Sequence, residues 1–403
     1  MAKILQPRFL FATTTQMFRY QGDAVHVAEV SRELTALNAP VTLVAAGEPT
    51  QKLGEVYYIN GGRVKPGSFI RRVASYIKHT ANILFHVIKH AKKADILYTR
   101  DALLGFSFYA LRPITQLPLI FEMNGLRGAE KQMQVNGAFT RLSFVFFSFF
   151  EKFITTHADH VICVTQGLKD ILIDDYSVDA NKISVISNGV NLKLFTPAVD
   201  LDKQLQIYTN LNVSIDDKII MYIGGLQPWQ DITTVIKSVN RLAHTIDRLT
   251  FVIVGDGIQY DSLKKTISKL ESDVNIIMTG KISYANVPSY LSIADVCVLP
   301  RTKDVNEKTG LSPIKLYSYL ACGKPIIATR IKGFEFLEEH HIGSLIPIDD
   351  DICFADAIAY WLQRIKEDKQ LPNRIRTYAE ENCGWDKTAK EVLAVCKGVI
   401  EKK

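Results

Sequence analysis

Apolar residues along this chain fall into two patterns that alternate over most of its length. Short apolar runs such as "RFLFATTT", residues 8–15, and "PVTLVAA", residues 40–46, are typical of buried strands. The segment between these two runs places Val27, Val30 and Leu34 at helical spacing. Strands and helices that alternate on this scale predict a parallel sheet covered by helices.

The alternation stops in a polar, weakly periodic seam over residues 191–217 and then begins again. We therefore predict an α/β fold of two doubly wound, Rossmann-like parallel-sheet domains that face each other across a cleft, over residues 1–195 and 196–375. Residues 376–403 are expected to form a C-terminal helix that can pack back on the first domain. Open parallel sheets bind ligands beyond the carboxyl ends of their strands, so the cleft is the expected site.

The composition narrows the range of compartments and partners. The formal net charge of +6 suits phosphate-bearing ligands or an anionic membrane surface, but it is too small and dispersed to indicate nucleic acid. We expect no secretory signal and no membrane-spanning helix, because the first residues lack a signal-like apolar segment and no apolar run reaches the roughly 18–20 residues that such a helix needs. The chain's six scattered cysteines form no CxxC pair. We expect a cytoplasmic protein with reduced cysteines.

The segment "GLSPIKLYSYLACGKPII", residues 310–327, carries the most specific chemistry. Ser312 and Pro313 lead into a predicted helix that ends at Gly323. A helix start offers unpaired N–H groups and the positive end of a dipole, which together can hold a diphosphate. Lys315 adds a full positive charge in the first turn; the alternative is a lysine that faces solvent.

Three glycine-containing turns follow strands of the second half, in "YIGG", "VGDG" and "TGKI". Glycine lets a backbone approach a phosphate closely and present its N–H groups. Each turn is equally compatible with a plain connection between strand and helix.

The order of these motifs resembles the retaining glycosyltransferases of the GT-B fold, family 4. The residues that carry the resemblance include "HADHVICVTQGLKDIL", "ISNGVNLKLFTP", "YIGGLQPWQDITTVIKSV" and "SPIKLYSYLACGKPIIAT". The resemblance implies transfer of a sugar from a nucleotide-sugar donor with retained anomeric configuration, without a metal or another cofactor. It also implies that the donor lies mainly on the second domain and the acceptor mainly on the first.

The resemblance also implies roles for individual residues. Gly22 would lie in the loop that faces the donor, and Asn124 falls where many members carry a histidine near the reacting sugar. Gly224 and Gly225 would begin a phosphate-facing turn, and Gly280 and Lys281 would flank the base. The diphosphate would be wrapped by Ser312, Pro313, Ile314, Lys315 and Leu316.

Two departures from the family pattern stand out. Gly310 and Ser318 occupy the positions of two glutamates that many members use to contact the donor sugar and the ribose. Gly225 and Gln230 stand where an arginine and a lysine are common. Arg301, Lys303 and Lys308, in the loop "PRTKDVNEKTG", are candidates to replace that charge. We expect an active enzyme with an altered donor grip in which Lys315 is the most sensitive residue.

Two helices bear on the acceptor. The segment 68–93 combines apolar residues with Arg71, Arg72, Lys78, Lys89, Lys92 and Lys93, and the segment 138–156 is rich in phenylalanine. An amphipathic basic helix can lie on an anionic membrane, which would suit peripheral association at the inner face and a lipid-linked acceptor or a growing polysaccharide. Alternatively, both helices pack in the core of the first domain and expose only their charges.

Two further functions compete with an active glycosyltransferase. A catalytically degenerate homologue that serves as a partner subunit would explain the missing glutamates. A nucleotide-sugar epimerase can share the two-domain architecture, but it needs carboxylates and histidines that converge in the cleft. His26 is the only such histidine that the sequence suggests.

Overall fold

The computed structural model describes residues 6–17, 22–47, 56–62, 69–126, 138–198, 200–270, 274–303 and 306–402. The described chain divides into two compact units. Unit 1 runs up to Asn188 and resumes at Trp385, and unit 2 spans Gly189–Gly384. The sequence placed the corresponding boundaries after residues 195 and 375.

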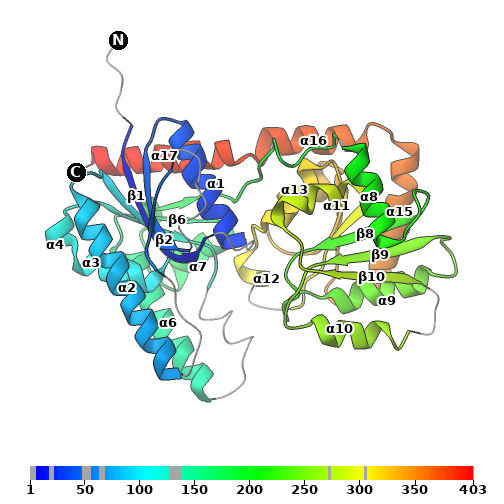
Figure 1. Ribbon diagram of the computed structural model, residues 1–403, viewed down its shortest axis with the longest axis horizontal. Helices are drawn as coiled ribbons and strands as arrows, with labels where there is room; N and C mark the ends of the chain where they lie inside the picture. Colours follow the sequence, from blue (N-terminus) through cyan, green and yellow to red (C-terminus); the bar gives the residue numbers. More distant parts are fainter. Residues whose placement is uncertain are drawn as a thin grey trace, which may run out of the picture. The chain divides into compact units, whose positions relative to one another are not determined.

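Unit 1 is built on a seven-stranded parallel sheet with the order β3-β2-β1-β4-β5-β6-β7 (Figure 1). Its strands are β1 (Phe9–Gln16), β2 (Val41–Ala46), β3 (Tyr57–Asn60), β4 (Ile96–Thr99), β5 (Leu119–Met123), β6 (His160–Cys163) and β7 (Ile183–Val185). Its helices are α1 (Gly22–Ala36), α2 (Phe69–Ala91), α3 (Ala102–Ala110), α4 (Arg112–Thr115), α6 (Ala138–His157), α7 (Gln166–Asp174), the 3₁₀ helix η1 (Ala180–Lys182) and α17 (Trp385–Glu401).

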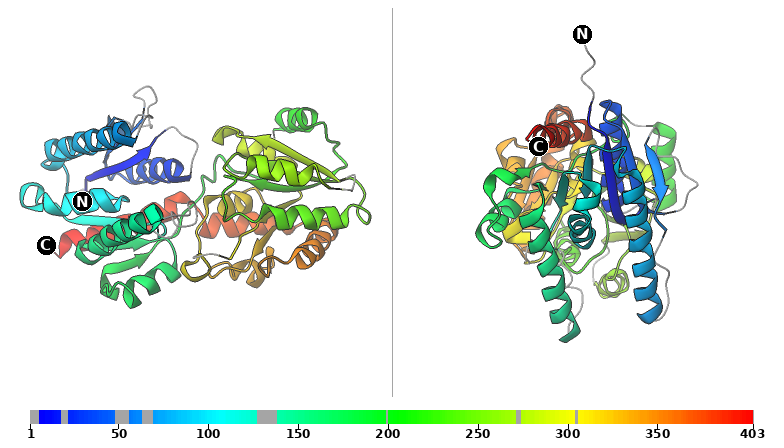
Figure 2. Two further views of the ribbon diagram at one scale, coloured as in Figure 1. Left: turned by 90° about the horizontal axis from the view of Figure 1, so that it is seen from below. Right: turned by 90° about the vertical axis from the view of Figure 1, so that its left-hand side faces the viewer.

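The strand residues of unit 1 alternate between two buried faces. Leu10 and Ala12 of β1 join one apolar cluster with residues of α2, α3, α6 and α7. Phe11 points to the other face, where its ring meets Tyr98 of β4 at 4.8 Å between centroids. Helix α17 packs along α1, so the last helix of the chain belongs to the first unit (Figure 2). Both faces of the sheet are therefore covered, as parallel sheets require.

Unit 2 holds a six-stranded parallel sheet with the order β10-β9-β8-β11-β12-β13. Its strands are β8 (Lys218–Ile223), β9 (Leu249–Val254), β10 (Asn275–Gly280), β11 (Val296–Leu299), β12 (Ile326–Thr329) and β13 (Gly343–Ile346). Its helices are α8 (Leu201–Leu211), α9 (Ile232–Leu242), α10 (Tyr260–Ile267), η2 (Tyr284–Asn286), α11 (Val287–Ile293), α12 (Asn306–Thr309), α13 (Ile314–Ala321), α14 (Phe336–Glu339), α15 (Asp351–Glu367) and α16 (Leu371–Asn382).

Both sheets reverse their strand order at one point, and the prediction of two doubly wound parallel sheets is confirmed. In unit 1 the reversal lies between β1 and β4, and in unit 2 between β8 and β11. Helices that follow the two strands of such a pair leave the sheet on opposite faces, which opens a crevice at the carboxyl ends of these strands. The loops after β1, β4, β8 and β11 are therefore where ligand contacts are expected.

The polar seam over residues 191–217 contains helix α8, which its weak periodicity did not predict. Leu201 and Leu205 are exposed in this helix and Ile207 is its one buried residue, so the sequence lacks the apolar stripe that marks most packed helices. All six cysteines are free and five of them are buried, as expected for reduced core residues. Among the described helices, none has the length and apolar character needed to cross a membrane.

Candidate active site

The crevice of unit 2 brings several of the predicted residues to one edge of the sheet. Gly224 and Gly225 follow β8, and Arg301 lies just after β11, so these residues flank the strand-order reversal. Helix α13, which carries Lys315 in its first turn, connects β11 to β12. The fold thus places two cations and a glycine turn in the loops where a doubly wound sheet binds ligands.

Lys315 points into this edge rather than into solvent. Its Nζ donates a hydrogen bond to the Tyr222 hydroxyl at 2.8 Å and lies 4.3 Å from the centre of the Tyr222 ring. The Tyr222 hydroxyl in turn donates to the carbonyl oxygen of Gly225 at 2.9 Å. The alternative of a solvent-facing lysine is therefore wrong, and the aromatic ring holds the ammonium group against the glycine turn.

The electrostatics of this edge favour a bound anion. Burial lowers the pKa of Lys315 well below its ordinary value, and the positive charge of Arg301 lowers it further. The Arg301 side chain is itself 6% exposed. Among the described groups that shift the pKa of Lys315, none is acidic. A diphosphate would supply the negative charge that these two cations share.

The start of α13 leaves its first N–H groups without a side-chain cap among the described residues. Pro313 is the N-cap residue, in an extended conformation, and it carries no polar side chain. The Ser312 hydroxyl is occupied locally, since it lies 2.8 Å from the Tyr317 hydroxyl. The Leu316 N–H donates to the Pro313 carbonyl oxygen at 2.9 Å. What α13 offers a ligand is thus the backbone N–H groups of Ile314 and Lys315 together with the ammonium group of Lys315.

The glycine turns of the three neighbouring strands lie against one another. Gly255, which follows β9, donates from its N–H to the carbonyl oxygen of Gly280 at 2.9 Å. A Cβ at Gly255 would collide with the backbone carbonyl of Gly224, so only glycine fits there. Gly280 thus lies two strands from Gly224, and Lys281 after it is exposed.

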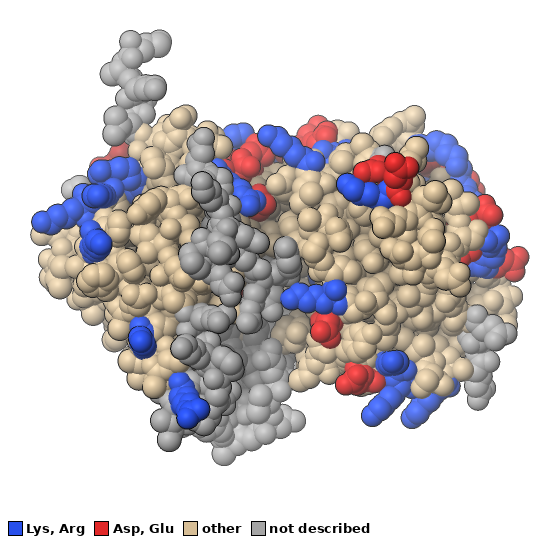
Figure 3. Space-filling view, in the orientation of Figure 1, with Lys and Arg blue, Asp and Glu red and all other residues tan. Residues whose placement is uncertain are grey.

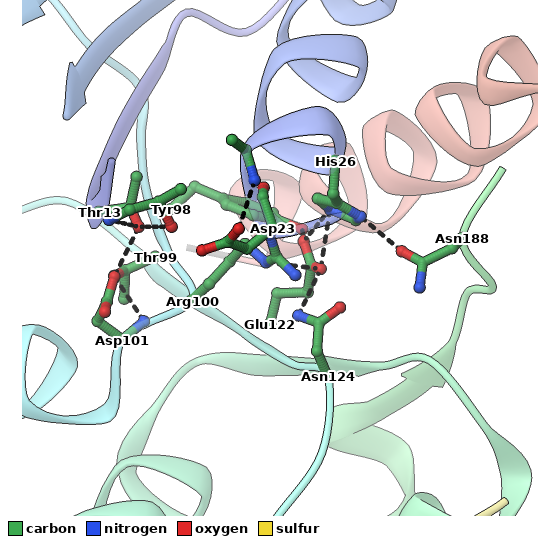
Figure 4. Close-up of polar contacts among 12 residues, drawn as sticks. Thr13, Asp23, His26, Tyr98, Thr99, Arg100, Asp101, Glu122, Asn124 and Asn188 are labelled. Atoms are coloured by element: carbon green, nitrogen blue, oxygen red, sulfur yellow. Dashed lines mark hydrogen bonds and ion pairs between the residues drawn. The ribbon is translucent and has the colours of Figure 1, made fainter. Parts of the chain in front are cut away.

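Unit 1 contains a buried polar network centred on Glu122 of β5 (Figure 4). The Glu122 carboxylate accepts hydrogen bonds from the Tyr98 hydroxyl at 2.5 Å, from His26 Nε2 at 3.1 Å and from Asn124 Nδ2 at 2.9 Å. Arg100 Nε lies 3.2 Å from the same carboxylate as an ion pair. Donors from α1, β4 and the loops after β4 and β5 therefore converge on one side chain.

The network keeps Glu122 ionised although it is buried. Burial alone would raise the pKa of the Glu122 carboxyl. Electrostatic interactions with His26 and Arg100, together with the hydrogen bonds from His26 and Tyr98, outweigh burial and hold that pKa well below its ordinary value. Burial and the Glu122 charge raise the pKa of Tyr98, so Tyr98 remains a donor.

Comparisons with known proteins agree with this geometry. The family model described as "Glycosyltransferase Family 4" matches residues 20–194 of this chain. The family model described as "Glycosyl transferases group 1" matches residues 207–382. This chain belongs to the family-4 glycosyltransferases of the GT-B fold. It is 21% identical over 390 residues to an uncharacterized glycosyltransferase of Methanocaldococcus jannaschii, covering 94% of this chain and 95% of that protein.

Some other relatives, and some proteins of similar structure, carry names that state an activity or a ligand. A UDP-Gal:alpha-D-GlcNAc-diphosphoundecaprenol alpha-1,3-galactosyltransferase of Escherichia coli is 28% identical over 235 residues, 56% of each chain. The structure of sucrose-phosphate synthase from Thermosynechococcus elongatus matches with a TM-score of 0.77 at 19% identity, over 98% of this chain and 100% of that one. An Anabaena protein in complex with UDP and glucose matches with a TM-score of 0.72 at 17% identity, over 97% and 99%. The solved structures support the fold.

The structure shows how Gly310 and Ser318 fit at the two positions where many family members carry glutamates. Gly310 has φ of 68°, a backbone conformation that a glutamate adopts only with strain. Ser318 is buried, and its hydroxyl donates to the Ile314 carbonyl oxygen within α13 at 3.0 Å. The proton of Ser318 is thus used by its own helix, and only its lone pairs are available to a ribose hydroxyl.

In unit 1 of the glycosyltransferase, the two predicted residues lie at the carboxyl edge of the sheet. Gly22 is the first residue of α1 and is exposed, and Asn124 follows β5 and is exposed. Sequence reasoning missed Tyr222, because a tyrosine within an apolar run is indistinguishable from a core residue. It also missed Glu122, although a single acid inside the run "LPLIFEM" is a signal, since a buried carboxylate needs partners.

Replacing Gly224 by alanine should weaken the binding of a nucleoside diphosphate by about tenfold, the loss of one charge-assisted contact. A Cβ at Gly224 would lie 2.8 Å from Cε of Lys315 and would force the ammonium group out of its position. Titration calorimetry against a nucleoside diphosphate that the unmodified protein binds would measure this loss.

The control for Gly224→Ala is Gly333→Ala. Gly333 also has a positive φ, at 95°, but its Cβ position has no atom within 4 Å from the described residues beyond its chain neighbours. Both variants therefore strain the backbone, while only one displaces Lys315. Equal losses of affinity in the two variants would contradict the placement of Lys315 at the ligand.

Proposed function

We propose that this glycosyltransferase is an active, retaining and metal-independent enzyme. It transfers a sugar from a nucleotide-sugar donor to a glycan or a lipid-linked acceptor in the synthesis of cell-surface polysaccharide or glycoconjugate. The observation that carries the proposal is the pair of cations, half-buried Lys315 and buried Arg301, beside the Gly224 turn and the start of α13. Such a site suits the diphosphate of a nucleotide sugar, as in the Anabaena protein in complex with UDP and glucose.

The chemistry that fits this arrangement is stabilisation of the leaving group. As the glycosidic bond to the diphosphate breaks, negative charge develops on the phosphate oxygen that leaves. Lys315, Arg301 and the N–H groups of α13 stabilise that charge, and the departing phosphate accepts the proton of the attacking hydroxyl on the same face of the sugar. This route retains the anomeric configuration and needs no pair of carboxylates.

Titration with a panel of nucleotide sugars, followed by an assay of nucleotide release with and without candidate acceptors, tests the proposal. We expect binding of at least one donor and acceptor-dependent release of the nucleoside diphosphate. The anomeric coupling constant in the product's NMR spectrum reports retention. Activity that survives a chelator agrees with metal independence, and activity that needs an added divalent cation contradicts it.

The absence of glutamates at Gly310 and Ser318 favours a second candidate, a catalytically degenerate homologue that acts as a partner subunit. The same experiment separates the alternatives. A partner subunit would bind none of the donors or would release no nucleotide. An epimerase would convert the sugar nucleotide without any added acceptor.

We further propose that unit 1 associates peripherally with an anionic membrane. Helix α2 has no acidic residue, and Ile77, Phe85 and Ile88 are 63%, 61% and 42% exposed. Ile77 and Ile88 are eleven residues apart, about three helical turns, so they share one face, and exposed Lys78 and Lys89 lie beside it. Figure 3 shows basic side chains along α2 on an otherwise uncharged surface, with no acidic side chain among them.

Helix α6 adds exposed apolar side chains to unit 1. Val145, Phe146 and Phe149 are 60%, 50% and 59% exposed, and α6 and α2 both extend beyond the sheet of this unit (Figures 1 and 2). Apolar residues flanked by lysine and arginine are the combination that binds the surface of an anionic bilayer. This reading suits an acceptor that is anchored in lipid.

Sedimentation with vesicles that contain anionic lipid tests the membrane proposal. We expect the protein to sediment with anionic vesicles at low salt, to bind neutral vesicles weakly, and to lose binding when Ile77 and Phe85 are both replaced by serine. The control replaces Leu201 and Leu205, which are exposed on α8 of unit 2, a helix that also carries Asp202. Equal binding by the two double variants would contradict the proposal.

A further inference from the structure

Of the described donors around the Glu122 carboxylate, Asn124 is the one that is exposed to solvent. His26 and Tyr98 are buried and the Arg100 side chain is 8% exposed, whereas Asn124 is exposed at the carboxyl edge of the sheet. The Asn124 side chain is therefore the part of this network that a substrate can touch.

The hydrogen bond to Glu122 fixes the orientation of the Asn124 amide. An ionised carboxylate only accepts hydrogen bonds, so the Asn124 group that lies 2.9 Å from Glu122 Oε1 must be the NH₂ group. The opposite orientation would place two acceptor oxygens against each other. The amide oxygen of Asn124 consequently faces away from Glu122, as Figure 4 shows. A hydrogen-bond acceptor is thus presented at the edge of unit 1.

We propose that Glu122 is a positioning residue, which holds Asn124 so that its amide oxygen accepts a hydrogen bond from a sugar hydroxyl of the substrate. This inference rests on the proposed function. It adds a statement about specificity: the group that meets the amide oxygen of Asn124 is a neutral hydroxyl, because a phosphate or carboxylate would bring a second acceptor against that oxygen without a proton to share.

The surroundings of Glu122 are set by groups on several elements. His26 of α1 has its Nε2 at 3.1 Å from the Glu122 carboxylate, its Nδ1 2.6 Å from Oδ1 of Asn188, and its ring 5.1 Å from that of Trp385 in α17. Tyr98 of β4 donates its hydroxyl proton to Glu122. Cys396 of α17 contributes to the raised pKa of Tyr98, after burial and Glu122. Arg100 adds a positive charge and donates from Nη1 to the backbone oxygen of Asp23. These contacts keep Glu122 ionised, and Asn124 therefore turns its NH₂ group towards the carboxylate.

The test is the substitution Asn124→Asp, which keeps the size of the side chain. At neutral and alkaline pH the new carboxylate faces the Glu122 carboxylate, so repulsion turns it away and raises its pKa by about one unit or more. Below that raised pKa the carboxyl group is protonated. It then donates to Glu122 as the amide does and again presents an oxygen outward.

We expect the activity of Asn124→Asp, relative to the unmodified enzyme at the same pH, to be about tenfold lower at pH 8 and to recover towards pH 5. The acid recovery should disappear when Glu122 is also replaced by glutamine, because a glutamine amide can donate to the aspartate at every pH. Asn181→Asp, at an exposed position of unit 1, is the control and should show no acid recovery.

The outcomes separate this inference from the proposed function. If the unmodified protein transfers sugar and the relative activity of Asn124→Asp does not depend on pH, the positioning role of Glu122 is overturned. The same holds if acid recovery persists in the double variant. If the unmodified protein transfers no sugar to any acceptor, the proposed function has failed. The inference then still predicts an acid-dependent return of any substrate binding that Asn124→Asp weakens.

Discussion

Replacing Lys315 by methionine should lower kcat/KM for sugar transfer by about 100- to 1000-fold, the range seen when one stabiliser of transition-state charge is removed. Methionine retains much of the length of lysine and can stay against the Tyr222 ring, so the change removes the charge and little of the packing. The loss should lie mainly in kcat, because the negative charge on the leaving phosphate is greatest in the transition state.

Two measurements accompany the kinetics of Lys315→Met. Lys237→Met, at an exposed position of α9, controls for the loss of one positive charge and should leave kcat/KM within about twofold. Titration with a nucleoside diphosphate in buffers of different ionisation enthalpy reports proton uptake, since a bound diphosphate raises the lowered pKa of Lys315. Near and above that pKa, proton uptake should occur in the unmodified protein and vanish in the variant.

The same substitution should stabilise the ligand-free protein. A lysine whose pKa is lowered in the folded state binds fewer protons there than in the unfolded chain, so folding penalises its charged form. This penalty is full below the folded pKa and fades as pH rises towards the unfolded value. Lys315→Met should therefore have a higher Tm than the unmodified protein at neutral pH, with the difference decreasing at alkaline pH. A lower Tm with unchanged kinetics would show that Lys315 is a structural residue.

The sequence predicted those parts of the candidate site whose structure depends on residues close together in the chain. The start of α13 was predicted at the Ser-Pro-Ile-Lys segment because the turn residues, the helix pattern and the terminal Gly323 lie within 14 residues. The roles predicted for Gly22, Gly224, Gly280 and their neighbours remain predictions, but the strand ends on which they lie follow from the pattern of apolar runs.

The sequence could not reveal contacts between residues that are distant along the chain. Glu122 meets His26, 96 residues away, and nothing in the periodicity of α1 or β5 identifies that pair. In the same way, the hydroxyl of Tyr222 receives Lys315 from 93 residues away. Such pairs depend on the register of neighbouring strands and on how each helix lies on the sheet, which are tertiary properties.

The loop after β11 shows most clearly that the sequence could not rank candidate residues by their burial. Arg301, Lys303 and Lys308 are equivalent candidates in the sequence for the missing charge, but the structure distinguishes them. Arg301 is buried and lowers the pKa of Lys315, whereas Lys303 and Lys308 are exposed. The backbone N–H of Arg301 donates to the Thr329 hydroxyl at 2.8 Å, which anchors it next to β12.

Arg301→Met should weaken the binding of a nucleoside diphosphate by about 10- to 100-fold, because a buried charge-assisted contact contributes roughly 1.5–3 kcal/mol. The backbone anchor to Thr329 is independent of the side chain and should survive. Lys308→Met removes an exposed charge from the same loop and should cost much less affinity, since exposed charges are screened. Titration calorimetry on the three proteins gives the comparison, and equal losses would reject the assignment of Arg301.

The pH dependence of binding gives Arg301→Met a second, independent readout. Lys315 must be protonated to hold the diphosphate, so affinity should fall as pH rises through the pKa that Lys315 has in the ligand-free protein. Burial and the charge of Arg301 both lower that pKa, and the variant removes the second influence. The alkaline fall in affinity should therefore move to higher pH in Arg301→Met, although affinity at neutral pH is weaker. A fall at unchanged pH would mean that the two cations do not share one anion site.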